Sequence, residues 1–125
     1  MDIKVLSIQG DWVYFSSKYG DAFGRWKDNF HPEKKRYNVE LDYNGVISSS
    51  QIRRSDLKCS KIDTKNNFLL FTGKVDEVEE GYLSIRIGDS FINFEIDESI
   101  DIKEINESFV TISVDNIDLY DEHVI

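Results

Sequence analysis

The sequence predicts a mainly β protein: an antiparallel curved sheet, or a small β-barrel or sandwich, of about eight short strands. Three observations favour this fold class. Apolar and polar residues alternate in several segments, the chain has a single proline, and turn-forming residues recur at short intervals. At 125 residues the chain has the length of one domain with one hydrophobic core. We therefore predict a single domain over residues 1–125.

The clearest strand covers residues 37–43, where apolar residues occupy every second position. The same alternation predicts a hairpin over residues 82–97, with its turn at residues 88–90, and a strand near residues 110–114. Further strands are expected at residues 3–8, 12–16, 57–62, 68–75 and 117–120. We find no sequence repeat, low-complexity tract or domain boundary.

Residues 17–36 show a different period. Large aromatic residues fall at spacings of four, three and four, at Tyr19, Phe23, Trp26 and Phe30, which matches one face of a helix. Asp21 is a candidate N-cap, and Pro32 disfavours helix in the residue before it. We expect one short helix near residues 21–30, packed across a barrel end or a sheet face.

Charge is distributed unevenly along the chain. Residues 1–65 carry twelve Lys and Arg against nine Asp and Glu, whereas residues 66–125 carry three against fifteen. The net charges of these two parts are therefore +3 and −12, which sum to the −9 of the whole chain. An acidic surface of this kind steers a basic protein partner into fast association.

The acidic half supplies the predicted partner-binding surface. Carboxylates precede the turn at Gly81 and follow the 82–97 hairpin, and the strand whose inward residues are Ile92 and Phe94 presents alternate residues outward. The predicted partner-binding residues are Glu77, Glu79, Glu80, Tyr82, Phe91, Glu95 and Asp97. The alternative interpretation is that these acids keep a β protein soluble and protect its sheet edges.

Aromatic and basic residues in the first half suggest an alternative face. Rings and cations together suit stacking on unpaired bases and pairing with phosphates, as in an OB-like single-stranded nucleic-acid-binding module, and aromatic residues also line the mouths of small-ligand-binding barrels. The residues of this alternative face are Trp12, Tyr14, Tyr19, Arg25 and Trp26. The net charge opposes nucleic acid, and the plainer interpretation is that the aromatic stripe closes the core.

The sequence contains no pattern typical of catalysis or metal binding. It lacks a phosphate-binding glycine loop, a nucleophile elbow and a metalloprotease motif. Residues 76–81 lack the ligand spacing of a calcium loop, and His123 beside Asp121 and Glu122 is expected to be a tail residue. Cys59 shares a face with Leu57 and is expected to be a small buried residue. We predict no enzyme activity, no cofactor and no metal site.

No segment approaches the roughly 18 apolar residues of a membrane span, and the first residues lack the features of a secretory signal. With a lone cysteine, this indicates a cytoplasmic protein without a membrane partner; the oligomeric state stays open. In this general profile the chain resembles bacterial toxin-neutralising immunity proteins, which are small, acidic, rich in antiparallel strands and without catalytic residues. The resemblance is one of character and rests on no motif. It implies an inhibitor that neutralises a basic protein such as a toxin nuclease.

Overall fold

The computed structural model describes residues 1–122, which contain twelve strands and two short helices. The mainly β prediction is confirmed. The strands are β1 (Asp2–Gln9), β2 (Trp12–Ser17), β3 (Gly20–Trp26), β4 (Arg36–Asp42), β5 (Val46–Ile47), β6 (Ile52–Arg54), β7 (Lys61–Lys65), β8 (Phe68–Glu79), β9 (Tyr82–Ile87), β10 (Ser90–Ile96), β11 (Phe109–Val114) and β12 (Asp118–Asp121). The helices are the 3-10 helix η1 (Ser49–Gln51) and the single-turn α1 (Ile102–Ile105).

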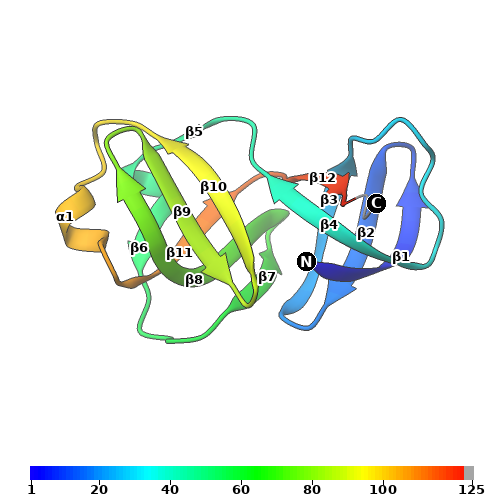
Figure 1. Ribbon diagram of the computed structural model, residues 1–125, viewed down its shortest axis with the longest axis horizontal. Helices are drawn as coiled ribbons and strands as arrows, with labels where there is room; N and C mark the ends of the chain where they lie inside the picture. Colours follow the sequence, from blue (N-terminus) through cyan, green and yellow to red (C-terminus); the bar gives the residue numbers. More distant parts are fainter. Residues whose placement is uncertain (123–125) are drawn as a thin grey trace.

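The strands form two lobes that lie side by side (Figure 1). The first lobe is a closed five-stranded barrel in the order β1-β2-β3-β12-β4. The second lobe is a seven-stranded sheet in which β5-β10-β9-β8-β11-β6 are neighbours and β7 also pairs with β8. β5 and β6 are the two edge strands of this sheet. Because β5, η1 and β6 are consecutive in the chain, one segment supplies both edges.

Period-two alternation explains both cores. In the first lobe the side chains of Ile3, Val13 and Phe15 are fully buried, and in the second lobe those of Ile85 and Ile92 are. Each buried side chain of this size stabilises the fold by about 1.5–3 kcal/mol relative to an exposed one. The interior of the barrel is thus packed with side chains, and the pockets lie on the outer faces and between the lobes.

The two lobes contain an internal repeat that sequence reasoning missed. Gln9 pairs with Trp12 in the first lobe, and Glu79 pairs with Tyr82 in the second, so each partner recurs 70 positions later. The same offset relates the β2–β3 hairpin to the β9–β10 hairpin, which the sequence predicted correctly. Both lobes also have an irregularity at the equivalent place, between Val5 and Ser7 in β1 and 70 positions later in β8.

The last strands of the two repeats are exchanged. In the first lobe β12 pairs in parallel with β3, where Asp118 lies opposite Arg25. In the second lobe β5 pairs in parallel with β10, where Val46 lies opposite Glu95, the residue equivalent to Arg25. Each lobe is therefore completed by a strand from the other repeat, and the chain crosses from the first lobe to the second and back. The single domain over residues 1–125 stays a prediction, which this exchange favours.

The prediction of a short helix near residues 21–30 is wrong, because this segment contains most of strand β3. Its inward residues are Ala22, Gly24 and Trp26, all buried. Ala22 and Gly24 contribute little hydrophobic signal, so the period of two was hidden and the aromatic spacing looked helical. Close packing requires glycine at position 24. A Cβ atom there would lie only 2.9 Å from the carbonyl oxygen of Ile117, in the segment that leads into β12.

Two further expectations are corrected. The strand expected at residues 57–62 begins only at Lys61, and both Leu57 and Cys59 are exposed. The charge asymmetry of the sequence is also reduced by the fold. Residues 1–42 and 118–122, which build the first lobe, carry seven Lys and Arg against ten Asp and Glu, and residues 43–117 carry eight against fourteen. The resulting net charges are −3 and −6, because the basic residues of β6 and β7 join the acidic repeat.

None of the helices within residues 1–122 is long and apolar enough to cross a membrane.

Strand β7 and the β9–β10 turn join the lobes. The backbone N–H of Ile62 donates to the carbonyl oxygen of Tyr19 at 2.9 Å, and the Thr64 hydroxyl donates to the carbonyl oxygen of Asp21 at 3.2 Å. Gly20 permits this approach, since a Cβ there would overlap the backbone of Ile62. These contacts fix one side of the space between the lobes.

Candidate functional site

The outer side of β8, β9 and β10 carries the largest group of predicted partner-binding residues. Strand register sets them in adjacent cross-strand rows. One row places Glu79, Tyr82 and Glu95 side by side, and the next places Glu77, Ser84 and Asn93 side by side. We call the group formed by Glu77, Glu79, Tyr82, Phe91, Asn93 and Glu95 the acidic face.

Tyr82 is the centre of the acidic face. Its hydroxyl donates to Oδ1 of Asn93 at 2.8 Å, which fixes the ring diagonally across β9 and β10. Glu79 and Glu95 lie on the two strands that flank it, about 10 Å apart by two strand spacings. The arrangement presents an aromatic ring between two carboxylates.

Phe91 forms the end of the acidic face nearest the first lobe. Its ring is 43% exposed, and the guanidinium of Arg86 stacks over it at 4.8 Å from the ring centroid. Arg86 also pairs with Asp76 at 3.4 Å. This cation is thus already engaged by a ring and a carboxylate, which leaves it poorly placed to neutralise the other acids.

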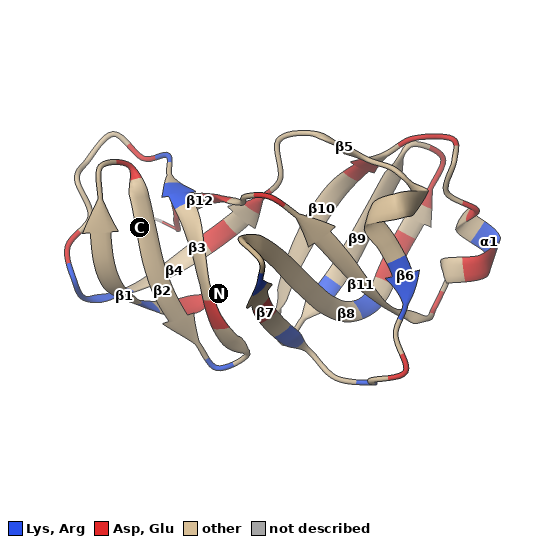
Figure 2. Cartoon of the chain, turned by 180° about the vertical axis from the view of Figure 1, so that it is seen from behind, with Lys and Arg blue, Asp and Glu red and all other residues tan. Residues whose placement is uncertain are grey.

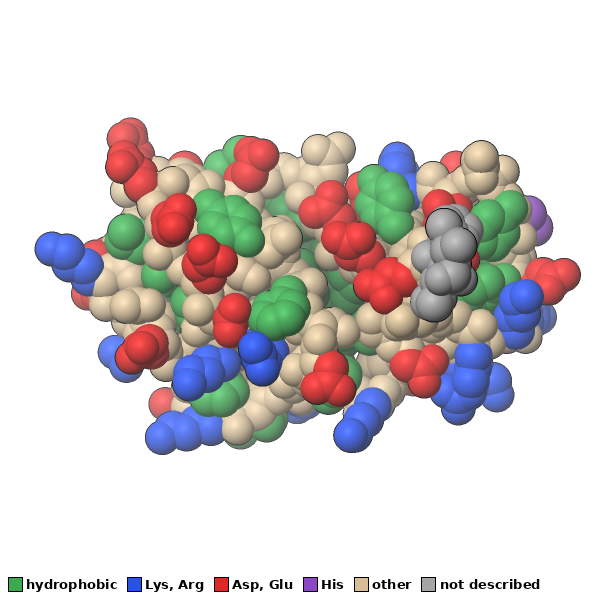
Figure 3. Space-filling view, in the orientation of Figure 1, with side chains coloured by type: hydrophobic (Ala, Val, Ile, Leu, Met, Phe, Trp, Pro, Cys, Tyr) green, Lys and Arg blue, Asp and Glu red, His purple; other side chains and the backbone are tan. Residues whose placement is uncertain are grey.

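Three carboxylates of the acidic face are available to a partner. Among the ion pairs within residues 1–122, none includes Glu77, Glu79 or Glu95, and all three side chains belong to exposed residues. The front of the second lobe shows acidic groups around apolar ones, with Lys and Arg along its lower edge (Figure 3). The face therefore offers negative charge beside apolar surface.

Two of the predicted partner-binding residues lie outside this group. Glu80 is in the turn between β8 and β9, next to Gly81. Asp97 follows β10, and its carboxylate accepts hydrogen bonds from the backbone N–H of Ser99 at 2.9 Å and from the Ser99 hydroxyl. Asp97 therefore has a local role in the chain turn. The binding role of all seven residues stays a prediction.

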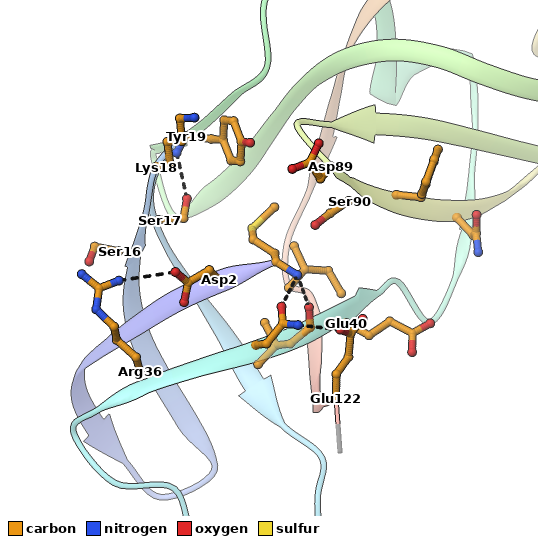
Figure 4. Close-up of a pocket in the computed structure, with 16 residues that line it drawn as sticks. Asp2, Ser16, Ser17, Lys18, Tyr19, Arg36, Glu40, Asp89, Ser90 and Glu122 are labelled. Atoms are coloured by element: carbon orange, nitrogen blue, oxygen red, sulfur yellow. Dashed lines mark hydrogen bonds and ion pairs between the residues drawn. The ribbon is translucent and has the colours of Figure 1, made fainter. Parts of the chain in front are cut away.

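A polar cleft of about 850 Å³ lies between the two lobes. Figure 4 shows Asp89, from the β9–β10 turn, and Ser90, at the start of β10, opposite Asp2 and Glu40 of the first lobe. The carboxylates that line the cleft are Asp2, Glu40, Asp89 and Glu122, and its cationic side chains are Lys18 and Arg36. Arg36 pairs with Asp2 at 3.6 Å. Since Phe91 and Asn93 also line the cleft, the acidic face continues into it.

Met1 also lines this cleft, and its amino group is hydrogen-bonded. It donates to Oδ1 of Asn38 at 3.1 Å and to the carbonyl oxygen of Val39 at 2.6 Å. The pKa of this amine is lowered overall, because the effect of burial exceeds that of the nearby carboxylates, Glu122 first, which raise it. The cleft was not predicted, because it is formed by residues far apart in the sequence.

The alternative aromatic face is assembled only in part. Trp12, Tyr14 and Arg25 share the outer side of β2 and β3, where Arg25 stacks over the Trp12 ring at 4.8 Å and Phe23 contacts both Trp12 and Tyr14. A groove of about 710 Å³ between β3 and β7 is lined by Tyr14, Tyr19 and Phe23. Trp26 does not belong to this face: it is 5% exposed, and its indole N–H donates to the carbonyl oxygen of Phe30 at 3.0 Å.

In the part of the chain that the structure describes, no three His, Cys, Asp or Glu side chains converge in a way that could hold a metal ion. His123 lies outside the described residues. Comparisons with protein families, with curated proteins and with solved structures found no significant match to this chain.

Proposed function

We propose that this protein is a non-catalytic binding protein whose acidic face receives a basic protein partner. The observation that carries the proposal is the row formed by Glu79, Tyr82 and Glu95, in which two carboxylates without an ion pair within residues 1–122 flank a hydrogen-bonded ring. Tyrosine is enriched among residues that dominate binding energy. Carboxylates that flank such a ring attract Lys and Arg of a partner and orient it on approach.

The rest of the surface supports the same partner chemistry. Phe91 adds exposed apolar area at one end of the face, and the neighbouring cleft adds the carboxylates of Asp89 and Glu40. A partner that covers the face would meet the carboxylates of the sheet and those of Asp89 and Glu40 in the cleft, where Lys18 and Arg36 also lie. Its contact surface should therefore be basic, with at least one apolar group to pack on Tyr82 or Phe91.

The specific form that we propose is neutralisation of a basic toxin such as a nuclease. A nuclease needs Lys and Arg to hold phosphates, and an acidic inhibitor can occupy that groove in place of the substrate. We further propose that the protein works in the cytoplasm. Its only cysteine, Cys59, is exposed and free, which suits a reducing compartment.

Affinity capture with matched variants tests the proposal. The baits are the wild type, a face variant with Glu79→Lys and Glu95→Lys, and a control variant with Glu98→Lys and Glu104→Lys. The control makes the same change in net charge at exposed positions of the same lobe that lie outside the acidic face. Extracts of the source organism are treated with nuclease, and bound proteins are identified by mass spectrometry.

The proposal predicts that the wild type and the control variant recover the same basic protein and that the face variant does not. Purified components must then reproduce this difference in direct binding. Recovery of the same material by all three baits, or of nothing by any of them, would contradict the proposed function.

A further inference from the structure

A basic pocket, separate from the cleft and from the groove between β3 and β7, lies on another side of the second lobe, away from the acidic face. Figure 2, drawn from behind, shows Lys and Arg on β6, β7 and β8. A pocket of about 290 Å³ opens here on the outer side of β6, β11 and β8. We call it the rear pocket; its lining includes Gln51, Arg53, Lys65, Leu70, Thr111 and Ser113.

Strand register explains how these residues meet. Arg53 of β6 lies opposite Thr111 of β11, which in turn lies opposite Thr72 of β8. Lys65, at the end of β7, pairs with Phe68 at the start of β8. The two cations therefore approach the pocket from opposite sides, one from each strand that flanks the β11–β8 pair.

The floor of the rear pocket is held in place by hydrogen bonds. The hydroxyls of Thr72 and Thr111, both on buried residues, are 2.8 Å apart. The Gln51 side chain donates to the carbonyl oxygen of Ser113 at 3.3 Å, which ties the start of β6 to β11. These bonds fix the Thr111 hydroxyl and the backbone beside Arg53 before any ligand binds, while the Arg53 side chain itself is exposed.

The two cations of the rear pocket have no carboxylate partner within residues 1–122. Asp63, on the same side of β7, pairs with Lys61 at 3.2 Å instead. Residues 51–65 carry five Lys and Arg against two Asp and Glu, in a chain whose net charge is −9. Residues 51–65 therefore form a locally basic segment in a chain that is acidic as a whole.

We propose that the rear pocket binds a phosphate group. The guanidinium of Arg53 can donate two parallel hydrogen bonds to a phosphate, Lys65 adds a point charge, and hydroxyls such as that of Ser113 can donate to the remaining oxygens. The volume suits one phosphate with a small group attached. This proposal is independent of the proposed function, because the two sites lie on different sides of the lobe and can be occupied together.

The first test is a titration of isotopically labelled protein with inorganic phosphate, followed by amide chemical shifts at constant ionic strength. We expect saturable shifts at Arg53, Thr111 and Ser113. Arg53→Gln and Lys65→Gln should each raise the dissociation constant for phosphate by roughly tenfold, since each removes a charge-assisted hydrogen bond. The control is Lys34→Gln, which removes an equal charge from an exposed position in the first lobe and should leave binding unchanged.

The source of the phosphate is distinguished by two further probes, adenosine monophosphate and a short oligothymidylate. Tighter binding of the mononucleotide than of inorganic phosphate would identify a small phosphorylated ligand. Tighter binding of the oligonucleotide, weakened steeply by salt, would identify a nucleic-acid backbone. Absence of saturable shifts at the rear pocket with all three probes would overturn the proposal, and so would equal weakening by Lys34→Gln. Both pocket variants replace exposed side chains and are checked for folding by their amide spectra.

Discussion

The ring of Tyr19 occupies the space that a Cβ atom at Gly88 would need. Tyr19 belongs to the β2–β3 turn of the first lobe, and Gly88 to the β9–β10 turn of the second. Gly88 also has a positive φ of 61° and donates its N–H to the Ser60 hydroxyl at 2.8 Å. Together with the hydrogen bonds from β7 to Tyr19 and Asp21, this contact fixes how the two lobes meet.

Gly88→Ala should destabilise the protein more than Gly10→Ala does. Gly10 has nearly the same φ, 62°, but open space around its Cβ position. Both variants carry the left-handed backbone cost of roughly 1–2 kcal/mol. Gly88→Ala must in addition displace the Tyr19 ring from its contact with the β9–β10 turn, which should cost a further ~1–3 kcal/mol. Urea unfolding measures the difference, and equal free energies of unfolding for the two variants would show that the contact does not constrain the lobes.

The exchange of last strands should couple the stability of the two lobes. Both tryptophans, Trp12 and Trp26, belong to the first lobe, so their fluorescence reports its unfolding alone. Ile92→Ala removes a fully buried side chain from the second lobe and should cost about 2–5 kcal/mol. We predict that the fluorescence transition moves to lower urea together with the circular dichroism transition. A fluorescence midpoint that stays at its wild-type value would mean that the lobes unfold independently.

Tyr120 should ionise at a higher pH than an unperturbed phenol. Burial first, and then the nearby carboxylates of Asp118, Asp42 and Asp28, raise the pKa of its phenol above 10.0. The unfolded phenol ionises near pH 10, so the stabilising contribution of neutral Tyr120 is complete below that pH and is lost as the pH rises through the folded-state pKa. Between about pH 9 and pH 11 the wild type should lose more stability in urea unfolding than Tyr120→Phe. Parallel losses in the two proteins would contradict the shift.

Arg86→Ala should increase attraction for a basic partner. The substitution removes a cation from the edge of the acidic face and releases Asp76 from its ion pair. Lys103→Ala is the control, because it removes the same charge from α1 in the same lobe. At low salt, Arg86→Ala should associate faster with the captured partner than the control does. A slower rate would indicate that stacking of Arg86 on Phe91 holds the apolar contact in its binding conformation.

Much of the fold could be predicted because alternation is a local signal. Residues 37–43 and the 82–97 hairpin were identified from period two alone, and the outward positions of Glu95 and Phe91 followed from the same pattern. The repeat escaped detection because its equivalent outward residues differ in chemistry, as Arg25 and Glu95 do. Gly24, at an inward position of β3, carries no hydrophobic signal, which led to the wrong helix.

The candidate site was predictable only where it follows one strand or hairpin. The row of Glu79, Tyr82 and Glu95 depends on register between β8, β9 and β10, and the hairpin turn already determines half of it. The cleft and the rear pocket combine residues that only the pairing of several strands brings together. Lys65 and Arg53, for example, meet because β6 and β7 flank the β11–β8 pair, and no local pattern contains that information.

The central claim is that the acidic face determines association with a basic partner. The most direct test measures the association rate of the purified partner with the wild type, the face variant (Glu79→Lys, Glu95→Lys) and the control variant (Glu98→Lys, Glu104→Lys), each over a series of salt concentrations. We predict that the face variant associates at least about tenfold more slowly than the control at low salt, and that the difference shrinks as salt screens the charges. Equal rates for the face and control variants at every salt concentration would contradict the claim.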